Sequence, residues 1–292
     1  MIEHTRIEAR DAIFHVATAG NGPPLILLHG WPEFWWTWKP VMHRLAPHFR
    51  LIAPDLRGFG DSDKPTRPWG AQDHAEDMIA LIDAMNLGTA GRVGLVGHDV
   101  GGAVIQAIAR TAPDKLAGLF LFDFVYPGIG PRMGKPNRLN EIWYQSFHQQ
   151  DLAVPLLSSS PEACRIYIEA IIRHWAHNQA AFDQPTIDTF VRNFQKPGNL
   201  AGGFAYYRAA HAGRMAMISG TAPQLPPITI PTCIRWATHD PIFPYAWTDR
   251  LPETFPNLDL APFPDVGHFP HREAPDQAAT EIATFFKTLS LG

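Results

Sequence analysis

The chain has 292 residues, of which 46% are hydrophobic and 18% are charged, and its formal net charge is −4. This composition is typical of a globular protein with a sizeable core, and the length suits one large domain with or without an inserted one. The sequence has no basic run, no signal-peptide segment and no apolar run of membrane-spanning length. We therefore expect no nucleic-acid or membrane partner and a cytoplasmic location. Cys164 and Cys233 do not have the spacing of a metal or redox site.

The first part of the chain alternates apolar runs with helical patterns. Short apolar runs bounded by Gly, Pro or Asp predict buried strands at 24–29, 51–53, 93–96 and 116–122. Helical periodicity between them predicts helices at 38–46, 73–85 and 101–110. Strands that alternate with helices favour right-handed βαβ units and a parallel sheet.

The pattern changes between residues 128 and 213, where helices are predicted at 139–148, 161–175 and 184–194, with no clear strand. A proline-rich stretch then leads to predicted strands at 232–237 and 258–263 and a closing helix at 276–289. We therefore expect a core domain made of residues 1–127 and 214–292. Residues 128–213 are expected to form a helical cap over the carboxyl ends of the strands.

The stretch Gly-Leu-Val-Gly-His-Asp-Val-Gly-Gly at 94–102 joins a predicted strand to a predicted helix. Gly97, Gly101 and Gly102 remove side chains where the two elements must pass closely, as in a nucleophile elbow. Such an elbow would present Asp99. An isolated Asp at this place is equally well explained as a helix N-cap. An ordinary cap does not need the three glycines, so the pattern favours the elbow.

A carboxylate is already ionised at neutral pH and needs no base to become a nucleophile. Attack on an ester or amide carbonyl would form an anhydride, whereas displacement at a saturated carbon would form an alkyl ester of Asp99. The leaving group must be good or be helped to leave, as an epoxide oxygen or a halide is. Water must then hydrolyse the ester, and that step requires a general base.

His268, in the loop after the last predicted strand, is the expected base, and His271 is the local alternative. The base needs an orienting acid. Asp240 and Asp123 both stand at the carboxyl end of a predicted strand. We expect Asp240, because its loop is held by two prolines, whereas an unpaired charge at Asp123 between two phenylalanines would be costly.

Backbone N–H groups are expected to bind the oxyanion that forms during ester hydrolysis. Trp31, after the first predicted strand, and Val100, after the nucleophile, are the candidates. The aromatic run at 34–38 would then border the pocket, although core packing explains most of its rings.

These motifs together resemble the epoxide hydrolase and dehalogenase branch of the α/β-hydrolases, which share the chain order nucleophile, acid, histidine. The resemblance rests on His-Gly-Trp-Pro at 29–32, Asp-Leu-Arg-Gly-Phe-Gly-Asp-Ser at 55–62, Gly-His-Asp-Val-Gly at 97–101, Trp-x-x-x-Asp at 236–240 and Gly-His at 267–268. It covers the chain from about residue 5 to 289. It implies an α/β-hydrolase fold, with a mostly parallel eight-stranded sheet, an inserted helical cap, and neither cofactor nor metal.

The resemblance also implies that two cap tyrosines bind the epoxide oxygen, because a phenol keeps its O–H at neutral pH. Tyr144 and Tyr207 lie in the matching segments, and Tyr206 is the alternative to Tyr207. Val100 and Gln145 depart from the dehalogenases. Those enzymes carry Arg or Trp after the nucleophile, and the haloacetate enzymes pair His with Trp in the first cap segment. Many epoxide hydrolases also carry Trp at the position of Val100.

The sequence therefore predicts an epoxide hydrolase that converts an apolar small molecule to a vicinal diol, as a monomer or homodimer. A haloalkane or haloacid dehalogenase is the alternative enzyme. A ligand-binding protein on the same scaffold is the non-enzymatic alternative, although binding alone requires none of Asp99, His268 and Asp240.

Overall fold

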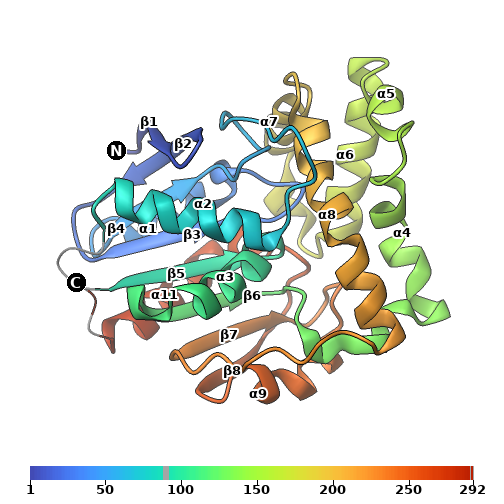
Figure 1. The fold of residues 1–292 in the computed structure, drawn as a ribbon. Helices are drawn as coiled ribbons and strands as arrows, with labels where there is room; N and C mark the ends of the chain where they lie inside the picture. The colour runs from blue at the N-terminus through green and yellow to red at the C-terminus, as the bar shows by residue number, and fades with distance from the viewer. Residues whose placement is uncertain (88–91, 290, 292) are drawn as a thin grey trace.

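Eight strands form a single sheet in the computed structural model, which describes residues 1–87, 92–289 and 291 (Figure 1). The strand order is β1-β2-β4-β3-β5-β6-β7-β8. Strand β2 pairs antiparallel with β1 and β4, and every other neighbouring pair is parallel. The strands are β1 (Glu3–Ala9), β2 (Ala12–Ala19), β3 (Pro24–Leu28), β4 (Arg50–Pro54), β5 (Val93–His98), β6 (Leu116–Phe122), β7 (Thr232–Ala237) and β8 (Leu258–Phe263).

The expected mostly parallel sheet of eight strands is confirmed. Strands β1 and β2 are not among the strands located from the sequence. They form an antiparallel hairpin at the edge of the sheet, and most of β1 is exposed. An exposed edge strand needs no continuous apolar run, so the pattern that marks the central strands is missing there.

Helices cover both faces of the sheet, which explains why the central strands are apolar throughout. In β3, Leu25 and Leu27 share a buried cluster with α1 and α11, whereas Ile26 and Leu28 share another with α2 and α3. Successive side chains of a strand point to opposite faces, so a strand covered twice is apolar at every position. These helices are α1 (Lys39–Leu45), α2 (Ala71–Ala84), α3 (Val100–Thr111) and α11 (Pro275–Lys287).

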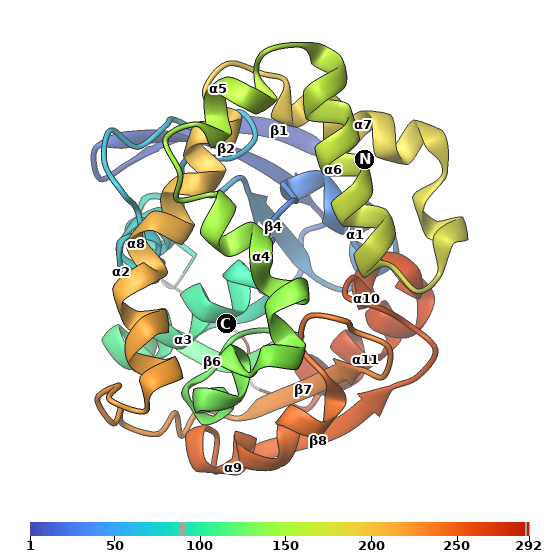
Figure 2. The ribbon, with the colours of Figure 1, turned by 90° about the vertical axis from the view of Figure 1, so that its right-hand side faces the viewer.

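Between β6 and β7 all regular elements are helical, and the longer helices gather beyond the carboxyl ends of the strands (Figure 1). Figure 2, viewed from their side, shows α4 and α8 in front of these strand ends. These helices are α4 (Leu139–Phe147), α5 (Ala153–Leu157), α6 (Pro161–Trp175), α7 (Gln184–Phe194) and α8 (Asn199–Ser219). Helices α9 (Leu251–Thr254) and α10 (Pro270–Glu273) are single turns near the end of the chain.

Helix α8 is not among the helices located from the sequence. It contains Gly202, Gly203 and Gly213, and its apolar residues do not follow one face, so both propensity and periodicity are weak. The domain boundary expected between residues 213 and 214 falls inside this helix, without a break in secondary structure. Within the described parts of the chain, no helix combines the length and apolar sequence that a membrane span requires.

Candidate active site

The turn between β5 and α3 presents Asp99 at the carboxyl end of a central strand. Asp99 has φ 50° and ψ −113°, a backbone conformation that non-glycine residues seldom adopt. Two glycines make the turn possible. A Cβ atom at Gly101 would lie 2.2 Å from the carbonyl oxygen of Leu28, and one at Gly97 would lie 2.5 Å from Ile105 Cδ1. The Asp99 side chain makes no capping hydrogen bond to α3, so the carboxylate is available to the cavity beside it.

His268 lies between Asp99 and Asp240. Its Nδ1 is 2.8 Å from Asp240 Oδ2, and its Nε2 is 3.9 Å from Asp99 Oδ2. The second oxygen of Asp240 accepts hydrogen bonds from the backbone N–H groups of Ile242 and Phe243, at 2.7 and 3.1 Å. A carboxylate only accepts hydrogen bonds. Nδ1 of His268 therefore carries the hydrogen, and Nε2 is turned toward Asp99.

Opposing effects act on the pKa of His268. Burial lowers the pKa, but the charge and hydrogen bond of Asp240, together with the charges of Asp99 and Glu33, raise it, and the net result lies above the ordinary value of 6.5. His268 is thus a stronger base than a free imidazole.

Asp123 lies next to Asp240 and makes no hydrogen bond to His268. Its Oδ1 accepts the backbone N–H of Ala237 at 2.9 Å, while its Oδ2 is buried without a donor. Burial, followed by the charge of Asp240, raises the pKa of Asp123 well above its ordinary value. Both effects favour the neutral form of Asp123. Of the two candidate acids, Asp240 is the one that contacts His268, and Asp123 is the neutral partner.

The two expected oxyanion donors lie at Asp99. The backbone N–H of Trp31 donates to Asp99 Oδ1 at 2.8 Å. Val100 is the first residue of α3, and N–H groups in a first helical turn have no acceptor within the helix. The aromatic run at 34–38 does not border the cavity and instead packs in and against the two core clusters, which corrects that expectation.

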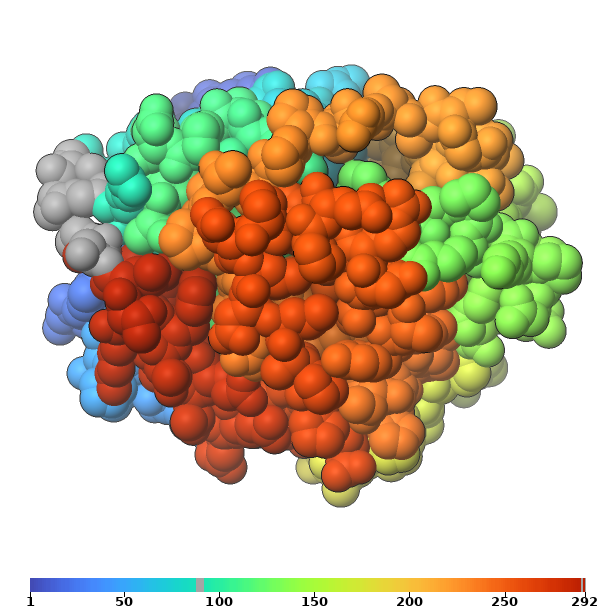
Figure 3. All heavy atoms as spheres, turned by 90° about the horizontal axis from the view of Figure 1, so that it is seen from below, coloured from blue at the N-terminus to red at the C-terminus, as the bar shows by residue number. Residues whose placement is uncertain are grey.

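A cavity of about 580 Å³ opens beside Asp99, between the sheet and helices α4 and α8. Its lining is mainly apolar and includes Val125, Met133, Met217 and Leu225. Figure 3 shows a hollow on this side of the molecule, bordered by orange atoms from the segment before β7 and green atoms from the segment after β6. An apolar cavity with a few convergent polar groups is the usual form of a small-molecule site.

Tyr144 of α4 and Tyr207 of α8 both line this cavity, and their ring centroids are 5.6 Å apart in an edge-on arrangement. Burial and nearby groups that include Asp99 raise the pKa of both tyrosines, so both hydroxyls keep their protons. Tyr206 lines the cavity as well, but its ring neighbours are His74 and Tyr207, whereas Tyr207 packs on Tyr144 and Trp31. This arrangement favours Tyr207 as the partner of Tyr144.

Gln145 and Arg214 add polar groups to the cavity wall, and neither was assigned a role in the site from the sequence. Arg214 Nη1 donates to Gln145 Oε1 at 2.9 Å, and Gln145 Nε2 donates to the Tyr144 hydroxyl at 3.1 Å. The two partners belong to different helices, α8 and α4, so no local motif connects them.

Helix α6 and the loop after it hold the loop of His268 in place. The backbone N–H of His268 donates to the Trp175 carbonyl at 2.9 Å, and the two rings meet edge-on at 4.9 Å. Glu273 Oε2 accepts the backbone N–H groups of Gly267, His177 and Asn178, at 2.9, 3.0 and 2.7 Å. The segments that meet here are far apart in the chain, which is why the sequence gives no signal for them.

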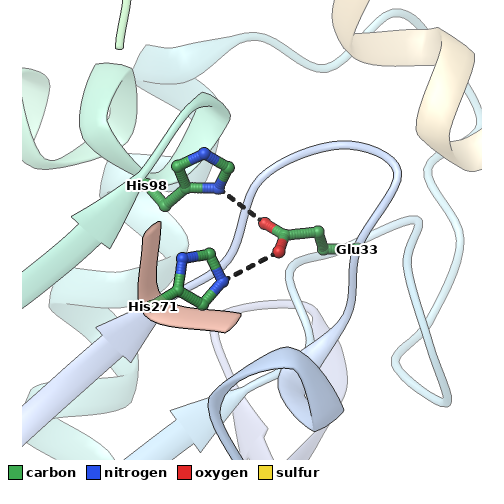
Figure 4. A group of neighbouring side chains, drawn as sticks. All are labelled: Glu33, His98 and His271. Carbon is green, nitrogen blue, oxygen red and sulfur yellow. Dashed lines mark hydrogen bonds and ion pairs between the residues drawn. The ribbon is translucent and has the colours of Figure 1, made fainter. Parts of the chain in front are cut away.

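His271 does not face Asp99, because it belongs to a separate buried cluster with Glu33 and His98 (Figure 4). Glu33 lies 2.9 Å from His271 Nε2 and 2.7 Å from His98 Nδ1, and His98 Nε2 lies 2.6 Å from the His268 carbonyl oxygen. Burial alone would raise the pKa of Glu33, but the two imidazoles hold it well below its ordinary value. The cluster therefore supports the backbone of His268 from behind.

Among the described residues, Glu33, His98 and His271 form the cluster whose side chains could in composition bind a metal ion. Their potential ligand atoms lie within 4.8 Å of one another. Both Glu33 oxygens already accept hydrogen bonds, from the Gly30 N–H and from Thr37 and His271. Protons shared between the imidazoles and the carboxylate account for these short contacts without an ion.

Comparison with known proteins agrees with this architecture. The pattern that describes the alpha/beta hydrolase fold matches residues 23–275. The soluble epoxide hydrolase of Corynebacterium sp. (strain C12) is 31% identical over 297 residues, which covers 99% of this chain and 98% of that protein. Epoxide hydrolase 2 of Siraitia grosvenorii is 39% identical over 233 residues, which covers 71% of this chain and 72% of that protein.

A solved structure extends the likeness to three dimensions. The structure of the epoxide hydrolase CorEH without ligand superposes with a TM-score of 0.82 at 29% identity and covers 99% of both chains. The sheet order, the site geometry and these matches agree. The chain therefore belongs to the alpha/beta hydrolase fold family and is a hydrolase with epoxide hydrolases among its relatives.

Proposed function

We propose that the protein is an epoxide hydrolase that works through an alkyl ester of Asp99. The observation that carries the proposal is the meeting of three kinds of group around one carboxylate. Asp99, on the elbow, lines an apolar cavity together with two protonated phenols. A histidine paired with a second carboxylate lies behind it, with Nε2 3.9 Å from Asp99 Oδ2. The relatives named epoxide hydrolases support it as well.

In the first step, Asp99 Oδ2 attacks an epoxide carbon, because Oδ1 is already engaged by the N–H of Trp31. The new C–O bond forms as the ring C–O bond breaks, and the electron pair goes to the epoxide oxygen. The hydroxyls of Tyr144 and Tyr207 bind this oxygen and supply its proton. In this scheme α4 to α8 act as the cap domain, which brings the phenols to the carboxylate of the core.

In the second step, His268 Nε2 removes a proton from water, and the hydroxide adds to the carboxyl carbon of Asp99. Negative charge develops on Oδ1, where the backbone N–H groups of Trp31 and Val100 stabilise it. Collapse of this intermediate breaks the bond between the Asp99 carboxyl carbon and the substrate oxygen, and His268 returns its proton to that oxygen. The vicinal diol is released, and the proton that remains on the Asp99 carboxyl group returns to the phenolate left by ring opening. Asp240 holds the imidazole in the required tautomer and stabilises its charged form.

A single turnover in ¹⁸O-labelled water, with enzyme in excess over styrene oxide, tests this scheme. We expect an unlabelled diol and one ¹⁸O atom in the peptide that contains Asp99, because water attacks the ester and not the epoxide. A labelled diol with unlabelled Asp99 would show direct attack by water. Halide release from haloalkanes, with no diol formed from any epoxide, would support the dehalogenase alternative.

A further inference from the structure

Arg214 is a half-buried cation in the wall of the apolar cavity. Its guanidinium lies 2.9 Å from Gln145 Oε1 and 3.4 Å from His211 Nδ1, and among the described residues no carboxylate pairs with it. A cation held this way loses hydration without gaining a counter-ion. Packing alone does not explain why an arginine occupies the site.

The bonding of Arg214 sets the direction of a hydrogen-bond chain. A guanidinium has only donors, so Gln145 must turn its Oε1 toward Arg214. The donor group of the same amide, Nε2, then faces the Tyr144 hydroxyl at 3.1 Å. Tyr144 is therefore the acceptor in this bond.

A phenol that accepts a hydrogen bond still has its own hydrogen to donate. Gln145 is the hydrogen-bond partner of the Tyr144 hydroxyl among the described residues, and its Nε2 cannot accept that hydrogen. Because Tyr144 lines the cavity together with Asp99, the hydrogen is available to a ligand oxygen placed there.

We propose that Arg214 and Gln145 are positioning residues for ring opening, which fix the Tyr144 hydroxyl as a donor toward the epoxide oxygen. This inference rests on the epoxide hydrolase function proposed above. As the ring opens, Tyr144 shares its proton with the epoxide oxygen and gains negative charge. The Gln145 N–H and the positive charge of Arg214 stabilise that charge.

Electrostatics agree with this role. Burial and the charge of Asp99 raise the pKa of Tyr144, whereas the Gln145 hydrogen bond and the charge of Arg214 act in the opposite direction. The hydroxyl of Tyr207 has no corresponding donor in the described part of the chain. Tyr144 is thus the stronger acid of the pair, and the two phenols have unequal roles.

Gln145→Glu tests the direction of the chain. Glu has nearly the same shape and keeps an oxygen for Arg214, but its other oxygen replaces the N–H donor with an acceptor. The Tyr144 hydrogen would then bond to Glu and be withdrawn from the substrate. We expect the rate of Asp99 alkylation by styrene oxide to fall about 10²-fold, with an unchanged rate of ester hydrolysis. A packing role for Gln145 predicts a mild effect, since the contact with Arg214 survives.

Four further variants serve as controls. Gln150→Glu adds the same charge at an exposed position beyond the same helix and should alkylate at the wild-type rate. In a Tyr144→Phe background, Gln145→Glu should have no additional effect. Arg214→Met should slow alkylation about tenfold through loss of the donor that orients the amide, and Arg214→Lys should restore most of the rate.

The outcomes separate the two proposals. If wild type and Gln150→Glu form no Asp99 adduct with any epoxide, the proposed function is wrong. If both form it and Gln145→Glu does so equally fast, the positioning role is wrong. An equal loss from Gln145→Glu in the Tyr144→Phe background would also overturn it, as would wild-type rates for Arg214→Met. If Gln145→Glu does not fold, the comparison of Arg214→Met with Arg214→Lys still tests the positioning role.

Discussion

Replacement of Asp123 by Asn tests the protonation state that the structure assigns to this buried carboxyl group. Asn has the shape of a neutral acid. In the wild-type protein the Ala237 N–H donates to Asp123 Oδ1 at 2.9 Å, and the amide oxygen of an Asn can accept the same N–H. The amide nitrogen of the Asn can donate to Asp240. Residue 123 has a φ of 30°, and Asn tolerates positive φ as Asp does. We therefore expect Asp123→Asn to fold and to retain activity.

The expected magnitudes differ widely between the two acids. Asp123→Asn replaces a neutral acid by a neutral amide that keeps the acceptor for the Ala237 N–H. This change is worth about 1 kcal/mol or less, so the rate of ester hydrolysis should stay within about tenfold of wild type. Asp240→Asn removes the carboxylate that lies 2.8 Å from His268 Nδ1. The wrong imidazole tautomer is then favoured, and the rate should fall about 10⁴-fold.

Stability gives an independent measure of the same protonation state. In the folded protein the pKa of Asp123 lies well above its ordinary value of 3.8, because of burial and the charge of Asp240. Its contribution to stability is therefore complete below 3.8 and is lost as pH rises through the folded pKa. Each pH unit by which the folded pKa exceeds the unfolded pKa amounts to about 1.4 kcal/mol in the free energy of unfolding. Since Asn has no proton to lose, Asp123→Asn should gain stability relative to wild type as pH rises.

Two assays check these expectations. Single-turnover kinetics with styrene oxide give the rate of ester hydrolysis in each variant, and urea unfolding at acidic and alkaline pH gives the stability difference. The reasoning is refuted if Asp123→Asn accumulates the ester while Asp240→Asn turns over normally. A stability difference that does not grow with pH would mean that Asp123 is ionised in the folded protein.

The remaining predictions concern the groups that react. Asp99→Ala should abolish turnover because it removes the nucleophile, and substantial residual hydrolysis in single-turnover measurements would argue against an alkyl ester at this residue. His268→Gln should trap the alkyl ester, which mass spectrometry would detect on the peptide containing Asp99. In wild type, ester hydrolysis should rise with pH as His268 loses its proton, because Nε2 must be neutral to take a proton from water. Tyr144→Phe and Tyr207→Phe should each slow ring opening about 10²–10³-fold in single-turnover measurements.

Local patterns predicted much of this fold. The strands at 116–122, 232–237 and 258–263 and the helices at 161–175 and 184–194 have the bounds given in the sequence analysis. Each of them combines a continuous apolar run or a periodic apolar pattern with a Pro or Asp at or next to one end, so the local sequence identifies it. The elbow was predictable for the same reason, because the glycines around Asp99 are needed to avoid steric clashes between the strand and the helix of one turn.

Contacts between distant segments were not predictable in this way. Trp175 meets His268, and Arg214 meets Gln145, only after the helices following β6 fold back over the sheet. Neither pair has a characteristic spacing, and each residue has an ordinary structural explanation when it is considered alone. Helix α8, which carries Arg214 and Tyr207, lacks the periodicity that would have identified it.

The two candidate acids show where sequence reasoning reaches its limit. Strands β6 and β7 are neighbours in a parallel sheet, so their carboxyl ends meet at one edge and bring Asp123 and Asp240 together. Two ionised carboxylates at neighbouring strand ends repel each other. Burial between Phe122 and Phe124 adds a desolvation cost for an ionised Asp123. The sequence suggests that this charge needs a partner. The folded chain instead raises the pKa of Asp123 well above its ordinary value and so favours its neutral form. Asp240 contacts two backbone N–H groups and His268, whereas Asp123 has a single N–H donor. The number of donors around each carboxyl group depends on the tertiary structure, and it favours Asp240 as the carboxylate that contacts His268.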